Sequence, residues 1–404
     1  MKRFYIIASL LVGTLAFSAC EQKLAEPVFT EPTEFVLNNP VLMNESFDRS
    51  KSDFIELVCS QPDYGFTAAT TYQVQVSLDG KFENEFDAKK ITGDYVTIDV
   101  DYTNTRINVS AEDLSIALTQ LRSVILTAEN PDITEDEMKA KFPYETAAYI
   151  RVKAFLTESK KGEILSNTVT FATLNVPYSL PEVFVPKDFY IVGQYNGWDW
   201  GTAYSFVPVN GNATDGKGKE GAFWRIIYLP EGGFKVNAVK VWDGGEVGYV
   251  KEDPLYTYVD NASSGLKEDG GNMAVTKAGW YIVVVKMTVE GRDIKYTIEV
   301  NEPNVYLMGP VAPVDDWKMV EENLFTVPAD ADGNFVSPAF KADSVEDSGV
   351  RACVNVGVDW WKSEFIVLNG EVAYRGTEGD QERVQGKTGQ KLYLNFTKGT
   401  GEIK

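Results

Sequence analysis

The sequence predicts an all-β protein of three tandem β-sandwich domains behind an N-terminal signal peptide, and two observations support this prediction. Short apolar segments rich in β-branched and aromatic residues recur along the 404 residues, separated by clusters of glycine, proline and asparagine. In addition, a strand that ends in glycine and leads into a tryptophan loop occurs twice, at 190–193 before Trp198 and at 306–309 before Trp317. The interval between the copies is the size of one all-β domain, so we expect two related modules after a first domain.

The N-terminus has the features of a targeting segment. Lys2 and Arg3 precede an apolar stretch, 4–17, that is too short to span a membrane. Small residues then lead to Cys20. This arrangement resembles the lipobox of bacterial lipoproteins, where the cysteine is lipidated and becomes the first residue. We therefore expect a lipoprotein signal peptide at 1–19 and lipidation of Cys20. Phe17 departs from the leucine usual at its place, which leaves an ordinary secretory signal as the alternative.

The next segments predict a tether and a first domain. Residues 20–35 are polar and contain Pro27 and Pro32, which is typical of an extended tether. Within 36–178, strands are expected at 54–59, 71–78, 95–100, 148–156 and 168–174. A helix should follow Ser110, which has Asp113 at capping-box spacing. Strands at this spacing favour an immunoglobulin- or fibronectin-like sandwich.

Two proline-containing segments divide the rest of the chain. Residues 175–186 and 301–304 each precede one copy of the repeated motif. Counting the first domain as the first module, we expect a second module at 187–301 and a third module at 303–404. All eight tryptophans lie after residue 197. Trp224 and Trp280 stand in the middle of apolar strands and are expected in the core.

The composition excludes several classes of function. A formal charge of −21 argues against nucleic acid and anionic membrane surfaces as partners, because both would repel the chain. Without histidine, a Ser-His-Asp or Cys-His catalytic arrangement is impossible, and with three cysteines so is the usual zinc site. No cofactor is expected. Cys59 and Cys353 lie in apolar strands of different domains and are expected as buried free thiols. Only paired carboxylates could support catalysis, and none has a distinguishing spacing.

The two modules carry aromatic and cationic residues in the same order, which favours glycan binding. Tryptophan stacks on the apolar face of a sugar ring while lysine or arginine bonds its hydroxyls. The candidates in the second module are Trp198, Lys235, Trp242 and Lys251. Those in the third module are Trp317, Arg351, Trp360 or Trp361, and Arg375.

Each candidate also has a purely structural interpretation. Trp198 could anchor its loop rather than present a platform, whereas Trp242 stands at a strand end and is expected to be exposed. Trp360 and Trp361 are adjacent, so in a strand one would point into the core and one outward. If all these tryptophans were core, the chain would be a structural or adhesive surface lipoprotein. A glycoside hydrolase with a carboxylate pair is the remaining alternative.

The succession of motifs resembles the SusE/SusF outer-membrane lipoproteins of the starch-utilisation type. The residues that carry the resemblance are the Cys20 lipobox, 61–65 (QPDYG) before 71–76 (TYQVQV), 150–154 (IRVKA), and two Tyr-x-x-Gly…Trp modules with 233–236 (GFKV) in the first. The resemblance covers essentially the whole chain after the signal peptide.

This resemblance implies a non-catalytic glycan-binding protein anchored by lipid to the outer membrane and exposed on the cell surface. It implies an immunoglobulin-like spacer domain and two carbohydrate-binding modules. The implied ligand is an oligosaccharide or polysaccharide, with starch or another α-glucan as the leading candidate. The implied partners are a SusC-like TonB-dependent transporter and a SusD-like lipoprotein. One departure is Val350-Arg351-Ala352, where the family often has Phe-Lys-Phe, so the third module is expected to differ in ligand or strength.

Overall fold

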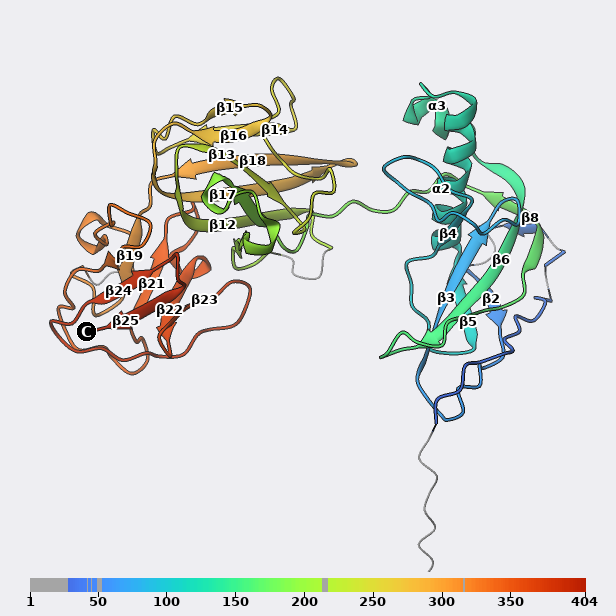
Figure 1. Cartoon of the computed structure of the whole chain (residues 1–404), viewed down its shortest axis with the longest axis horizontal. Helices are drawn as coiled ribbons and strands as arrows, with labels where there is room; N and C mark the ends of the chain where they lie inside the picture. Colours follow the sequence, from blue (N-terminus) through green and yellow to red (C-terminus); the bar gives the residue numbers. More distant parts are fainter. Residues whose placement is uncertain (1–27, 42, 45, 49–52, 213–216, 315–316) are drawn as a thin grey trace, which may run out of the picture. The chain divides into compact units, whose positions relative to one another are not determined.

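The structure is a computed structural model that describes residues 28–404 except 42, 45, 49–52, 213–216 and 315–316 (Figure 1). The chain divides into two compact units, Met1–Pro181 and Glu182–Lys404. The division falls in the proline-containing segment that the sequence marks as a boundary. None of the helices in the described part combines the length and apolar character needed to cross a bilayer. The prediction of an all-β architecture is confirmed.

The first unit is built on a six-stranded sheet covered by a two-stranded ribbon and a helix. The large sheet has the order β1 (Ser46–Asp48), β8 (Val169–Val176), β6 (Tyr144–Leu156), β3 (Thr70–Ser77), β4 (Tyr95–Thr97), with β7 (Ile164–Leu165) paired to β6. The ribbon consists of β2 (Phe54–Val58) and β5 (Arg106–Ser110). Apolar residues of both sheets and of helix α2 (Ala111–Glu129) form one core.

The helix begins where the sequence predicts. The Ser110 side chain accepts a hydrogen bond from the Asp113 backbone N–H, which caps the free end of α2. Leu114, Leu118 and Leu121 are buried in the core of the unit. A second short helix, α3 (Glu135–Lys139), was not predicted.

The expected tether is partly a component of the first unit. Residues 1–27, which include the expected signal peptide and the predicted lipidation site Cys20, lie outside the described residues. From Phe29 onward the chain packs on the unit: Phe29 stacks on Tyr64, and Thr30 N–H donates to the Tyr64 carbonyl at 2.9 Å. Phe35 is buried in the core. The aromatic residues explain this difference from a free tether, because their burial is favourable.

The second unit begins with a two-sheet sandwich, the second module. One sheet has the order β10 (Tyr204–Ser205), β9 (Tyr190–Gly193), β13 (Gly232–Asn237), β16 (Asn272–Val275), β15 (Lys267–Asp269). The other has the order β11 (Val207–Pro208), β12 (Glu220–Leu229), β17 (Gly279–Glu290), β18 (Asp293–Asn301), β14 (Tyr256–Asp260). Apolar side chains between the two sheets form its core.

The third module consists of one seven-stranded sheet. Its order is β19 (Val305–Met308), β21 (Arg351–Val354), β22 (Glu364–Leu368), β23 (Glu371–Tyr374), β25 (Thr400–Ile403), β24 (Leu392–Asn395), β20 (Phe335–Val336). Short 3₁₀ helices connect the strands of both modules: η1 (Gln194–Asn196), η2 (Trp200–Thr202), η3 (Glu321–Asn323) and η4 (Trp360–Lys362).

The two modules share a hydrophobic core, which the sequence patterns did not predict. Strand β17 is buried on both faces. Tyr281 and Val283 point into the core of the second module, while Trp280 and Ile282 belong to a cluster with the third module. The Trp280 ring meets Phe335 edge-on at 5.1 Å, and its Nε1–H donates to the Asp330 carbonyl at 3.0 Å.

Trp224 of β12 makes the same kind of junction. It is fully buried and contacts Phe365 and Tyr374 of the third module, with ring centroids 6.1 and 5.5 Å away. The prediction that Trp224 and Trp280 are core residues is confirmed. Their core, however, joins the modules on either side of the boundary expected at 301–304.

Both described cysteines are buried free thiols, as predicted. Burial raises the pKa of Cys59 to about 11 and raises that of Cys353 further. In a chain that starts at residue 21, we expect neither thiol to react with Ellman's reagent at about pH 8 until the protein is unfolded, because only the thiolate attacks. A fast reaction of the native protein would contradict the buried positions.

Candidate glycan-binding surfaces

Lys235 and Arg351 occupy equivalent positions in the two modules. Lys235 of β13 pairs with Val192 of β9, and Arg351 of β21 pairs with Met308 of β19. Val192 and Met308 each stand directly before the glycine of the repeated motif. The strand register therefore places one cation of each module at the same point of its sheet.

Trp198 and Trp242 form an aromatic pair beside Lys235. Their ring centroids are 6.3 Å apart, and the buried Trp200 supports Trp242 edge-on at 5.3 Å. Trp242 is 55% exposed, as predicted. The Trp198 ring lies over Gly233, where a Cβ would come within 3.1 Å of it. Gly233 and Lys235 are two residues apart in β13 and share a face of the sheet, so the cation and the indoles belong to one surface.

The two predicted lysines of the second module differ in their surroundings. The ammonium group of Lys235 makes no hydrogen bond or ion pair with any residue that the structure describes, so it can bond a ligand. Lys251 is exposed and lies 4.0 Å from Glu252. The described contacts do not join Lys251 to the Trp198–Trp242 pair.

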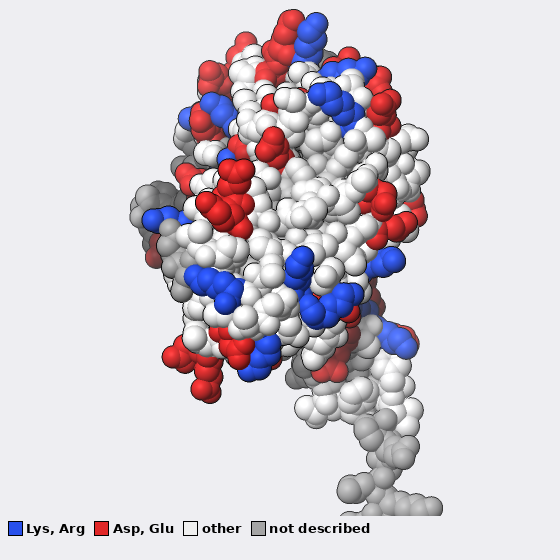
Figure 2. Space-filling model, turned by 90° about the vertical axis from the view of Figure 1, so that its left-hand side faces the viewer, with Lys and Arg blue, Asp and Glu red and all other residues white. Residues whose placement is uncertain are grey.

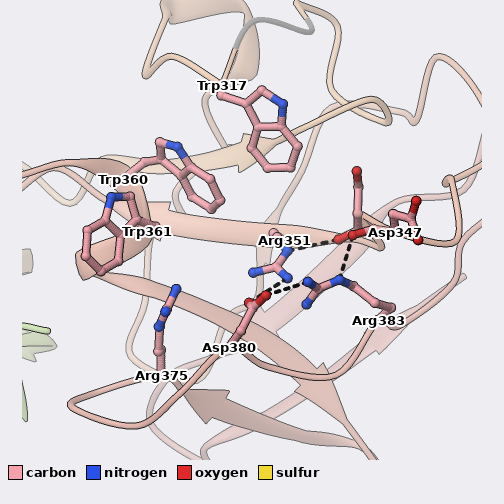
Figure 3. A pocket seen from close by; sticks show the side chains of 9 residues that line it. Trp317, Asp347, Arg351, Trp360, Trp361, Arg375, Asp380 and Arg383 are labelled. Carbon is pink, nitrogen blue, oxygen red and sulfur yellow. Dashed lines mark hydrogen bonds and ion pairs between the residues drawn. The ribbon is translucent and has the colours of Figure 1, made fainter.

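In the third module the candidates meet around a cavity of about 470 Å³. The indoles of Trp317, Trp360 and Trp361 follow one another along one side, and Arg351 and Arg375 lie on the other (Figure 3). Trp317 and Trp360 stack with ring centroids 4.6 Å apart and planes 27° apart. The Arg375 guanidinium lies 5.0 Å from the Trp361 ring centre.

The expectation that one of Trp360 and Trp361 would be core is wrong. Both are half-buried and both line the cavity. They belong to the 3₁₀ helix η4 rather than to a strand. A 3₁₀ helix has about three residues per turn, so neighbouring side chains diverge without pointing to opposite faces.

The loop tryptophans Trp198 and Trp317 share an unusual backbone. Their φ angles are +66° and +56°, in the left-handed region that non-glycine residues seldom adopt. Each ring covers a glycine: a Cβ at Gly309 would come within 2.7 Å of the Trp317 ring. The repeated glycine in the third module therefore makes room for the indole that follows it.

An alternating chain of charges fixes the cations of the third module. Glu364 is fully buried and bonds Arg351 through Oε2 and Arg375 through Oε1, the latter at 2.6 Å. Arg351, only 4% exposed, also bonds Asp380 at 3.0 Å, and Asp380 in turn bonds Arg383. Hydrogen bonds from Arg383 and Arg351 hold the pKa of Asp380 well below its usual range.

Sequence reasoning missed the acidic members of this network and Arg383. A signal for Glu364 was available, because it begins an apolar strand, EFIVL, and pairs opposite the apolar strand that carries Arg351. Charges of opposite sign inside two apolar strands indicate a buried ion pair. Asp347, Asp380 and Arg383 lie in loops and had no such signal.

We expect Glu364→Gln to destabilise the second unit by about 3 kcal/mol, because an amide leaves two buried guanidinium groups without their counter-charge. Denaturant unfolding of the chain 182–404 measures the change. Glu371→Gln, on the exposed side of the neighbouring strand β23, is the matched control and should be close to neutral. Equal stability of the two variants would contradict a central role for Glu364.

The surfaces have the chemistry of a binding site. Indole faces supply flat apolar contacts, and guanidinium and ammonium groups supply donors for hydroxyl oxygens. Figure 2 shows acidic and basic side chains spread around a largely uncharged area of the second unit. Among the described residues there is no group of three or more acidic or cysteine side chains that could hold a metal ion.

Comparison with known proteins gives the family. The family model described as "SusF/SusE starch specific CBMs" (carbohydrate-binding modules) matches residues 188–297 and again 304–402, together more than half of the chain. A second model, "SusE outer membrane protein", matches 23–124.

Two similar proteins come from Bacteroides thetaiotaomicron. The curated "Outer membrane protein SusF" is 39% identical over an alignment of 249 residues, which covers 58% of this chain and 47% of that protein. The chain thus spans about half the length of this relative. The crystal structure of SusF aligns with 92% of this chain and 100% of that chain, with 25% identity and a TM-score of 0.46. This chain belongs to the SusF/SusE family of carbohydrate-binding outer-membrane proteins.

Proposed function

We propose that the protein captures starch or a related α-glucan at the cell surface through two aromatic–cation surfaces, without acting on it chemically. The main support is the third-module cavity, where three tryptophans face Arg351 and Arg375. The second module repeats this combination at the same sheet position with Trp198, Trp242 and Lys235.

Sugar units would stack on the indoles while the cations bond their hydroxyls. Trp242 of the second module is exposed, and the Trp317–Trp360 pair borders an open cavity. These positions argue against a purely structural role for the tryptophans. The family consists of carbohydrate-binding modules, so the hydrolase alternative has no support.

The two surfaces are expected to differ in their affinity for the glycan. Arg351 and Arg375 are held by Glu364, whereas Lys235 has a flexible side chain and no such support. Donors that are already fixed lose less conformational freedom on binding. Two surfaces on one chain would raise the avidity for a long polysaccharide.

The cellular setting completes the proposal. A lipid on Cys20 would anchor the chain in the outer membrane, with the first unit as spacer. The resemblance to SusE/SusF proteins supports a SusC-like TonB-dependent transporter and a SusD-like lipoprotein as partners. Loss of surface exposure in a Cys20→Ala strain, measured by protease treatment of whole cells, would support the anchor.

Native gel electrophoresis with polysaccharides in the gel tests the binding. We expect starch, amylopectin or glycogen to retard the chain from residue 21, and gels with dextran or xylan to leave it unaffected. A variant with Trp198, Trp242, Trp317 and Trp360 all replaced by alanine should run as in a gel without glycan. Unchanged retardation of this variant would overturn the assignment of the surfaces.

A further inference from the structure

We infer that the third module holds a second, polar subsite that takes further sugar units of the glycan bound at the tryptophans; this inference rests on the proposed function. A hollow of about 1070 Å³ lies next to the aromatic cavity. The two share Asp347, Asp380 and Arg383 as lining residues. A glycan chain that leaves the aromatic cavity past these residues would enter the hollow.

Hydrogen bonds fix the residues that line both the aromatic cavity and the hollow. Arg383 donates through Nε to the Asp347 carbonyl at 2.7 Å, through Nη1 to the Gln381 carbonyl, and through Nη2 to Asp380. Asp380 also accepts a hydrogen bond from Arg351 of the aromatic cavity at 3.0 Å. The same ion network therefore borders both spaces.

Hydrogen bonds also join the two loops on either side of the hollow. Ser344 donates through Oγ to Gln385 Oε1 at 2.7 Å and accepts from Gly386 N–H at 2.9 Å. Val350 N–H donates to the Val384 carbonyl at 2.8 Å. Because these bonds exist before any ligand binds, a glycan would not need to order the loops.

The residues that line the hollow are suited to hydrogen bonding with neutral, hydroxyl-rich sugar units rather than to stacking on sugar rings. No aromatic residue lines the hollow among the described residues; besides the shared three, it is lined by Ser344, Glu346, Gln381 and Gln385. Carboxylates and amide oxygens accept hydrogen bonds from hydroxyls. Gln381 donates through Nε2 to the Ala373 carbonyl at 2.8 Å, but its buried Oε1 has no partner within the described part of the chain. The carboxylates of Glu346, Asp347 and Asp380 disfavour an acidic sugar.

The inference predicts that affinity depends on glycan length. Isothermal titration with the maltose series, from maltotriose to maltoheptaose, would use the chain from residue 21 with Trp198→Ala and Trp242→Ala, so that only the third module binds. We expect affinity to rise about tenfold along the series, which is the effect of one or two net hydrogen bonds.

Glu346→Ala and Gln385→Ala should remove this rise and leave maltotriose affinity unchanged. Glu382→Ala is the matched control, since Glu382 is exposed on the same loop as Gln385 but lines neither space. Glu346 is exposed, so its loss should not affect folding. The inference is overturned if affinity does not rise with length, or if the Glu346 and Gln385 variants behave like the Glu382 variant. Absence of binding by any member of the series, with the tryptophans of the third module intact, would instead overturn α-glucan binding at this site.

Discussion

We expect the chain 182–301, which lacks the third module, not to fold into a stable second module. The chain 182–404 is expected to fold. The shared core packs five apolar side chains of the second module against the third module: Trp224, Ile226, Trp280, Ile282 and Val284. Full burial of one large apolar side chain contributes about 1.5–3 kcal/mol. Exposing five of them removes roughly 10 kcal/mol, which is comparable to the whole stability of a typical domain.

Circular dichroism, thermal melting and NMR dispersion of the chains 182–301 and 182–404 measure this difference. The longer chain should melt cooperatively, because its limits coincide with those of a compact unit. The shorter chain should aggregate or melt without cooperativity. A sharp transition and a well-dispersed spectrum for 182–301 would show that the shared core is dispensable.

Replacing Trp317 by alanine should reduce the affinity of the third module for maltoheptaose at least tenfold. Trp317 provides the ring on which Trp360 stacks, and its loss removes one indole face and the support of the next. Central aromatic residues of binding sites often contribute about 2 kcal/mol or more, and about 1.4 kcal/mol already corresponds to tenfold. Titration in a chain that also carries Trp198→Ala and Trp242→Ala isolates this site.

Trp317→Phe is the control for this substitution, because it keeps a flat apolar ring in the same place. Its loss of affinity should be clearly smaller than that of Trp317→Ala. Far-UV circular dichroism of both variants checks that the module remains folded. Equal affinity of Trp317→Ala and the parent chain would mean that the glycan does not contact this indole.

Local patterns in the sequence were sufficient to predict much of the fold. Alternation of apolar and polar residues located β6, and Ser110 with Asp113 located the start of α2. The sequence placed Lys235 and Arg351 in the same order within the two modules, and the strand register puts them at the same point of their sheets. Each of these features depends on residues close together in the chain, so it can be predicted from a single sequence.

The shared core was missed although the sequence contains a sign of it. Strand β17 begins with GWYIVVVKM, an almost continuous apolar run. A strand with one face in solvent alternates apolar and polar residues, whereas a continuous apolar run indicates a strand that is buried on both faces. The second burying surface comes from residues after 305, and nothing in the run itself identifies that partner.

The cavity of the third module could be predicted only in part. Tryptophans and arginines drew attention by their type and order, but Trp360 and Trp361 were placed wrongly because a strand was assumed where a 3₁₀ helix forms. Asp380 and Arg383 come from a loop whose path depends on contacts with distant residues such as Asp347. Spacing along the chain cannot reveal such contacts.

A crystal structure of the chain 182–404 with maltoheptaose would show directly where the glycan binds. We predict sugar rings about 4 Å above the indoles at Trp317 with Trp360 and at Trp198 with Trp242. It also predicts hydroxyls within hydrogen-bond distance of Arg351 or Arg375 in one module and of Lys235 in the other. Glycan bound elsewhere on the chain, with all four indoles bare, would contradict it.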